Sequence, residues 1–129
     1  MAGGMSMDWK YDQLRITVHD EEMGCDLSVN IYGGDRAHIG SVAIAEPRPS
    51  LLGDGSVSAT VSTYNCIGHK DGEVASAVAH ELARCLNRRT VVVCGIHYDS
   101  IQPEVLAEVR SLTDRMVLDI AGKLSCRAE

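Results

Sequence analysis

The sequence has 129 residues and a formal net charge of −6 at pH 7, with 45% hydrophobic and 23% charged residues. This length is enough for one domain with its own hydrophobic core and too short for two. The chain has no excess of Lys and Arg, and only 4% of its residues are aromatic. Nucleic-acid binders depend on clustered basic residues and stacking rings, so we exclude nucleic acid as a partner.

The sequence also predicts where the protein works. No apolar run approaches the roughly 18 residues that a membrane helix needs, and the start of the chain lacks the basic and apolar regions of a secretory signal. The five cysteines are odd in number and never form a C-x-x-C pair. We therefore expect a cytoplasmic protein with reduced thiols and no membrane partner.

The first part of the chain is predicted to be mostly β-structure. Residues 1–12 are interpreted as a flexible N-terminal tail, and residues 13–126 as one domain. Alternating apolar and polar residues are typical of half-buried strands. They predict strands over residues 13–18, 27–31, 42–44 and 57–64. Pro47 and Pro49 are expected to end the third of these, because proline donates no ladder hydrogen bond.

The second part changes to a helical period. Residues 73–86 place apolar side chains three and four positions apart, which predicts an amphipathic helix with Asp71 as its N-cap. The Val-rich residues 90–94 predict a strand buried on both faces, and a second helix is expected to begin at Pro103. The predicted fold is an α/β single-domain sandwich. It has about five strands in a mostly antiparallel sheet and two main helices, in the order strand, strand, strand, strand, helix, strand, helix.

Three histidines are predicted to meet at one edge of this sheet. His38 follows the second strand, His69 the fourth and His97 the fifth, and a right-handed crossover brings these strand ends to the same edge. We expect His19 at the opposite edge and His80 facing solvent. Converging imidazoles suit a metal or ligand pocket. The alternative is that they cap the sheet by hydrogen-bonding loop carbonyls.

Residues 68–72, with the sequence GHKDG, open the first predicted helix. Unpaired N–H groups and the positive end of the helix dipole favour an anion at such a position, so a phosphate group can bind there with help from Lys70. The spacing of the glycines is not that of a nucleotide-binding Walker loop. The alternative interpretation is a capped helix start.

Three separate blocks also resemble a known family. They are GGDRAHIG at residues 33–40, GHKD at residues 68–71 and GIHYDSI at residues 95–101. Their order and sequence resemble the small prenylated-flavin chaperones, the LpdD-like D subunits that accompany UbiD enzymes of the gallate-decarboxylase type. The fold of this family is similar to that of proteasome assembly chaperones.

The resemblance implies a cofactor carrier and not an enzyme. Such a protein binds reduced prenylated FMN, which a flavin prenyltransferase makes, and delivers it to a UbiD-type decarboxylase apo-enzyme. FMN is the alternative cofactor. We also expect a homo-oligomer, most simply a dimer. The expected cofactor-binding residues are His38, Gly40, His69, Lys70, Asp71, His97, Tyr98 and Asp99. A divalent metal ion is expected on the imidazoles of His38, His69 and His97.

Two other functions stay open at this point. One is a hydrolase with a His-bound metal, in which Asp71 or Asp99 is the general base. The other is a protein-assembly chaperone that binds no small ligand.

Overall fold

The computed structural model describes residues 6–66 and 71–125 as one six-stranded sheet with two helices. The strands lie in the order β1-β2-β3-β6-β4-β5. The elements are β1 (Ser6–Tyr11), β2 (Ile16–Met23), β3 (Asp26–Gly34), β4 (Ser41–Pro49), β5 (Val57–Asn65), α1 (Asp71–Leu86), β6 (Thr90–His97) and α2 (Pro103–Ser125).

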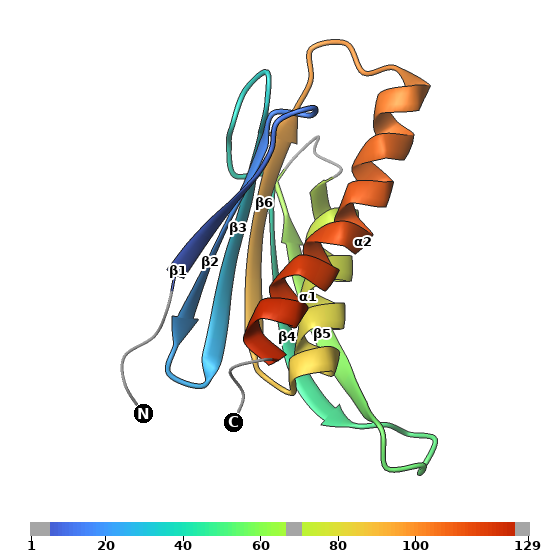
Figure 1. The fold of residues 1–129 in the computed structure, drawn as a ribbon. Coiled ribbons are helices and arrows are strands. Elements are labelled where there is room, and N and C mark those ends of the chain that lie inside the picture. The colour runs from blue at the N-terminus through green and yellow to red at the C-terminus, as the bar shows by residue number, and fades with distance from the viewer. Residues whose placement is uncertain (1–5, 67–70, 126–129) are drawn as a thin grey trace.

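Both helices cover the same face of the sheet (Figure 1). Alternate residues of the strands are buried beneath them, among them Val18, Val29 and Val92, each fully buried. α1 packs on β4, β5 and β6, and the small size of the buried alanines in the helix and in the strands allows a close approach. The other face of the sheet carries no helix, and we call it the open face.

β6 lies between β3 and β4, although both of these precede it in the chain by more than one element. It runs parallel to β3 and antiparallel to β4, and the remaining neighbours are antiparallel. The predicted mostly antiparallel α/β sandwich is confirmed. The prediction that this Val-rich strand is buried on both faces was wrong, because the helices cover only one face and leave Val91 and Val93 half-buried on the other.

The predicted N-terminal tail also needs correction. Ser6–Tyr11, within the expected tail of residues 1–12, form β1 and pair with β2 as a sixth strand. The reason lies in its aromatic residues. The Trp9 indole N–H donates to Asp20 at 2.6 Å, and the Tyr11 hydroxyl donates to Asp119 at 2.7 Å. These bonds tie β1 to β2 and to α2.

The third predicted strand is longer than expected. β4 continues through Pro47 to Pro49, so the prolines lie within the strand and do not end it before residue 47 as predicted. β4 pairs with β6 only as far as Ala45, and beyond that point it pairs with β5 alone. A proline is tolerated there because one side of the strand has no neighbour that needs its N–H group.

The helices agree closely with their predicted ranges. α1 begins at Asp71 and α2 at Pro103, where proline suits the first turn because its missing N–H would be unpaired. Near its C-terminal end α2 is fixed by Lys123, whose ammonium donates to the fully buried Asp20 at 2.5 Å. No helix within residues 6–66 and 71–125 is long and apolar enough to cross a membrane.

Candidate functional site

One edge of the sheet collects the ends of several strands, and we call it the rim. β3 and β6 both end there, because Gly34 pairs with His97, and β4 begins there, because Ser41 pairs with Cys94. Residues 35–40 connect β3 to β4 across the end of β6 (Figure 1). The rim thus gathers backbone from three strands that are distant in sequence.

The rim brings two of the predicted histidines together. The ring centroids of His38 and His97 lie 6.3 Å apart, with an angle of 81° between the ring planes. Their predicted meeting is confirmed, whereas their role stays a prediction. His97 is further oriented by Asp99, whose Oδ1 lies 3.1 Å from its Nε2. Both of these side chains are accessible, with exposed fractions of 36% for His97 and 73% for Asp99.

The connection over β6 is held at both ends by backbone hydrogen bonds. At its start, the Asp35 N–H donates to the His97 carbonyl at 2.6 Å. At its end, the Gly40 N–H donates to the Cys94 carbonyl at 2.9 Å, and the Gly40 carbonyl accepts from Cys66 at 2.8 Å. Gly40 therefore serves the site through its backbone, by fixing where the loop rejoins the sheet.

The Asp35 carboxylate locks this loop to the chain beyond β6. It accepts the backbone N–H of Asp99 at 2.8 Å and the Arg15 guanidinium at 2.6 Å. These two donors, the Asp99 N–H first, hold the pKa of Asp35 below its ordinary value. Sequence reasoning missed Asp35 and Arg15, although Asp35 lies inside the block that contains His38.

The Tyr98 side chain extends from the end of β6 toward the β1–β2 turn. Its hydroxyl donates to the Leu14 carbonyl at 2.6 Å, and its ring packs against the hydrophobic core. The Arg15 guanidinium lies 5.9 Å from the centre of the ring. Burial is the main cause that raises the pKa of the Tyr98 hydroxyl. This residue anchors the end of β6 to the β1–β2 turn.

The start of α1 also lies at the rim. Asn65, the last residue of β5, accepts a hydrogen bond from Ser41 at 2.9 Å, and its side chain lies where a Cβ on Gly72 would be. Glycine at position 72 therefore lets the first turn of α1 rest on the end of β5. The predicted site residues His69 and Lys70 lie outside the described residues, so the structure does not place them.

The open face has a groove directly beside the rim. It has a volume of about 430 Å³, within the range of ~300–1,000 Å³ typical of small-molecule sites. Side chains of β3 and β6 form its floor and residues of the connection from β3 to β4 form its wall. The lining residues are Asn30, Ile31, Tyr32, Ala37, His38, Ile39 and Val93. The alternation of apolar and polar residues along β3 is enough to predict that Asn30 and Tyr32 lie on the face away from the core. It does not predict that β3 pairs with β6, because neither segment specifies its neighbour.

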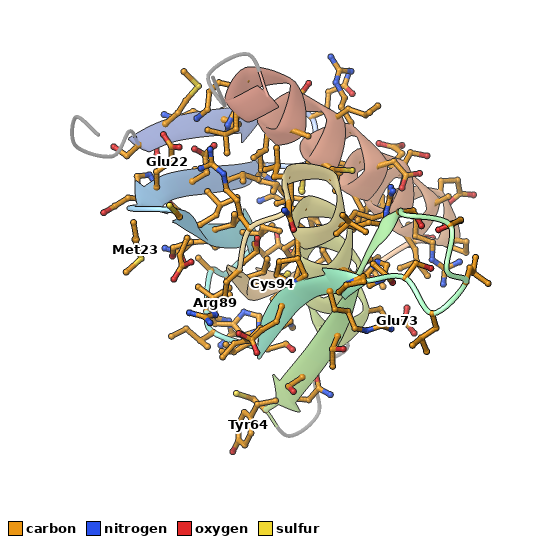
Figure 2. The ribbon with its side chains drawn as sticks, turned by 90° about the horizontal axis from the view of Figure 1, so that it is seen from below. Glu22, Met23, Tyr64, Glu73, Arg89 and Cys94 are labelled. Atoms are coloured by element: carbon orange, nitrogen blue, oxygen red, sulfur yellow. The ribbon has the colours of Figure 1, made fainter. Side chains whose placement is uncertain are left out.

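The open face also exposes apolar side chains beyond the groove. Ile44 is 45% exposed on β4 and Tyr64 is 71% exposed on β5. Figure 2 shows Tyr64 projecting from the end of β5 away from the two helices. Tyr64 lies opposite Val42, and Val42 lies opposite Val93 of the groove, so apolar side chains continue from the groove to β5. A contiguous apolar patch is typical of a surface that contacts a ligand or a partner.

The other histidines lie away from the rim. His19 lies in the middle of β2 and not at the opposite edge as predicted, since it pairs with Asp8 on β1 and Asn30 on β3. Its Nδ1 lies 2.5 Å from Asp8, and this hydrogen bond is the main cause that raises its pKa. His80 on α1 is half-buried beside Glu81, at 3.1 Å, so it is less exposed than predicted.

The predicted metal site is not complete within the described part of the chain. No group of three or more His, Cys, Asp or Glu side chains lies close enough to hold a metal ion there. His38 and His97 supply two imidazoles, and the third predicted ligand, His69, lies outside the described residues. Among the described cysteines, Cys25, Cys66, Cys85 and Cys94 form no disulfide.

The fold is similar to that of a known class of chaperone. The crystal structure of a novel chaperone complex for yeast 20S proteasome assembly aligns with a TM-score of 0.61 and 14% sequence identity. The alignment covers 93% of this chain and 96% of the other. At this identity the likeness shows the fold alone.

The sequence identifies the family. Residues 10–125 match the prenylated flavin chaperone LpdD-like domain, and the chain belongs to that family. No curated protein matches the chain in sequence. Membership of a chaperone family agrees with the predicted non-enzymatic role, and it confirms the resemblance that the blocks at residues 33–40, 68–71 and 95–101 indicated.

Proposed function

We propose that this protein binds reduced prenylated FMN at the rim and delivers it to a UbiD-type decarboxylase apo-enzyme. The observation that carries the proposal is the meeting of His38 and His97, from two distant connections, in a chain of the prenylated flavin chaperone family. Imidazoles can donate hydrogen bonds to phosphate or flavin oxygens. A flavin prenyltransferase is the expected source of the cofactor.

The phosphate end of the cofactor is proposed to bind at the start of α1. The first turn of a helix offers unpaired N–H groups to an anion. This start lies at the rim because Gly72 rests on Asn65, and Cys66 bonds to Gly40. The proposal therefore includes His69, Lys70 and Asp71 as phosphate-binding residues. In addition, Arg36 lies exposed on the same connection as His38, where it adds positive charge.

The proposed metal ion depends on His69. His38 and His97 provide imidazole nitrogens, which suit a divalent transition metal, and Asp99 is within hydrogen-bond distance of His97. A carboxylate beside a ligating imidazole is the usual arrangement that orients the ring toward a metal. When bound, such an ion would neutralise the charge of the phosphate or of the reduced flavin.

Delivery requires a site that both binds and releases its cargo. The accessible side chains of His97 and Asp99 support this role, because a cofactor held at an open rim can pass to another protein without unfolding of the carrier. We further propose that the protein forms a homodimer. The exposed Ile44 and Tyr64 on the open face support an interaction surface of this kind.

Co-expression with a flavin prenyltransferase tests the proposal. The purified protein should carry a flavin absorption spectrum and should restore decarboxylase activity to a UbiD-type apo-enzyme. His38→Ala and His97→Ala should each lower the affinity about tenfold, the loss of one charge-assisted hydrogen bond. His80→Ala is the matched control, because His80 lies in the middle of α1, beyond the first turn that is proposed to bind the phosphate. A protein that purifies without flavin and restores no activity would contradict the proposal.

The metal is tested separately. Titration of FMN with and without Mn²⁺ or Zn²⁺ should show tighter binding with the ion, and His69→Ala should remove the difference. Equal affinities under both conditions would remove the metal from the proposal and leave flavin binding in place.

A further inference from the structure

The groove on the open face lies elsewhere in the fold than two further hollows of similar volume among the described residues. One of about 400 Å³ lies between the β1–β2 turn and α2, and one of about 410 Å³ lies in the β4–β5 hairpin. The open-face groove alone among these three includes His38 of the rim. A ligand that touches the rim can therefore extend into this groove without crossing the sheet.

The groove has one polar side and one apolar side. The strand register places His19, Asn30, Val93 and Val42 in one row across β2, β3, β6 and β4. Polar side chains thus lie toward β2 and apolar side chains toward β4. Ile39 adds to the apolar side from the wall, with 65% of its surface exposed.

The isoalloxazine ring of a flavin has the same division. One end is an apolar dimethylbenzene ring, and the other is a pyrimidine ring whose edge alternates carbonyl oxygens with an N–H group. The Asn30 side chain offers both a donor and an acceptor, which matches this edge. Among the described residues the Asn30 side chain has no hydrogen-bonding partner, so the amide is available to a ligand.

We propose that the isoalloxazine ring of the cofactor lies in the open-face groove, with its pyrimidine end at Asn30 and its dimethylbenzene end between Val93 and Ile39. This assignment rests on the proposed function, since it concerns the same cofactor. His38 lies at the junction, where the ring in the groove meets the part of the cofactor held at the rim. Tyr32, with 38% of its surface exposed, lines the groove beside the ring.

The groove is formed by the backbone before any ligand arrives. The wall follows β6 because the His38 carbonyl packs on Gly95, and Gly40 bonds to Cys94 at the end of the wall. A preformed groove costs little ordering on binding. Its open side leaves the ring reachable by the enzyme that receives it.

Two probes separate the ring from the phosphate. Lumichrome has the fused ring system without the ribityl phosphate, and FMN has both. Ile39→Asp places a charge against the apolar end of the ring, and Leu118→Asp on α2, a similarly exposed apolar residue outside the groove, is the matched control. Ile39→Asp should weaken both probes about tenfold, and Leu118→Asp should leave both within about twofold. Flavin fluorescence quenching gives the affinities.

A second pair of variants tests the polar end of the groove. Asn30→Ala should weaken binding of both probes several-fold, because it removes a donor and an acceptor. Ser28→Ala, on the same face of β3 and outside the groove, should not. Both positions are half-buried on a face without a helix, so we expect the variants to fold, and thermal melting checks this.

The outcomes distinguish the two proposals. If the parent binds FMN and both Ile39→Asp and Asn30→Ala bind it equally well, the ring lies elsewhere and only the groove assignment is overturned. If the parent binds lumichrome with the expected losses, the groove assignment is supported even where the His38→Ala and His97→Ala variants keep their affinity. If the parent binds neither prenylated FMN, FMN nor lumichrome, both proposals fail.

Discussion

The carbonyl group of His38 packs directly against the Cα atom of Gly95, and a Cβ atom at position 95 would overlap it. His38 lies in the connection from β3 to β4 and Gly95 lies in β6, and their contact decides how closely the connection of residues 35–40 follows β6. It also sets the position of the His38 ring relative to His97. Position 95 therefore requires glycine because of a neighbour, since its φ angle is not among the positive ones.

Gly95→Ala should displace the connection and destabilise the protein by about 1–3 kcal/mol, the usual cost of overpacking. The affinity for FMN should fall as well, because His38 moves. Gly122→Ala in α2 is the control. A Cβ there meets nothing within 4 Å, so alanine should stabilise the helix by roughly 0.5–1 kcal/mol. Urea unfolding measures both, and equal effects would contradict the contact.

The buried Asp20 should depend strongly on its partners. Asp20 is fully buried and accepts hydrogen bonds from Lys123 and Trp9. Lys123→Ala leaves this carboxylate without its cation and should cost about 3 kcal/mol. Arg89→Ala breaks an exposed ion pair with Glu46 and should have a much smaller effect, because solvent screens this pair. Urea titration should show a clear loss of unfolding free energy for Lys123→Ala and little for Arg89→Ala, and similar losses for both variants would argue against this difference.

His19 should make stability depend on pH. Its pKa is raised in the folded protein, chiefly by the hydrogen bond to Asp8 and further by Glu21. The protonated form is therefore favoured by folding. This contribution is complete below the ordinary value of 6.5 and is lost as the pH rises through the higher folded pKa. Between about pH 5.5 and about pH 9 the melting temperature of the parent should fall more than that of His19→Gln. Parallel curves would contradict the coupling.

Asp35 should hold the rim in place more than it stabilises the fold. Asp35→Ala removes the acceptor of the Asp99 N–H, so exchange of this amide should become faster, and FMN binding should weaken. Asp54→Ala is the control, because Asp54 accepts a backbone N–H from Ser56 in the hairpin at the far end of β4. It should leave FMN binding unchanged. The carboxylate of Asp35 acts above its ordinary pKa of 3.8, and its contribution is lost as the pH falls through the lower folded value.

Much of the architecture could be predicted from periodicity. Local patterns predict most of the elements: apolar and polar residues alternate in β2, β3 and β5, and apolar stripes recur in α1 and α2. The preference for right-handed crossovers then predicts that His38 and His97 lie at one edge of the sheet. β1 was missed because its strand character depends on Trp9 and Tyr11 bonding to Asp20 and Asp119, which lie elsewhere in the chain.

The groove could not be predicted in the same way. Asn30 and Val93 are adjacent only because β3 pairs with β6, and nothing in either segment specifies that neighbour. Likewise, the glycines at positions 72 and 95 are explained by contacts with Asn65 and His38, which only the folded chain reveals. Local patterns predicted which elements form, whereas the site depends on which of them touch.

The late position of β6 in the chain has a consequence for biosynthesis. A nascent polypeptide that ends before Thr90 holds two ribbons, β1-β2-β3 and β4-β5, whose facing edges are both unsatisfied. Only the arrival of β6 joins them, so the proposed cofactor site cannot form before β6 has been synthesised. Ribosome-bound fragments truncated before this strand should therefore be aggregation-prone and unable to capture flavin.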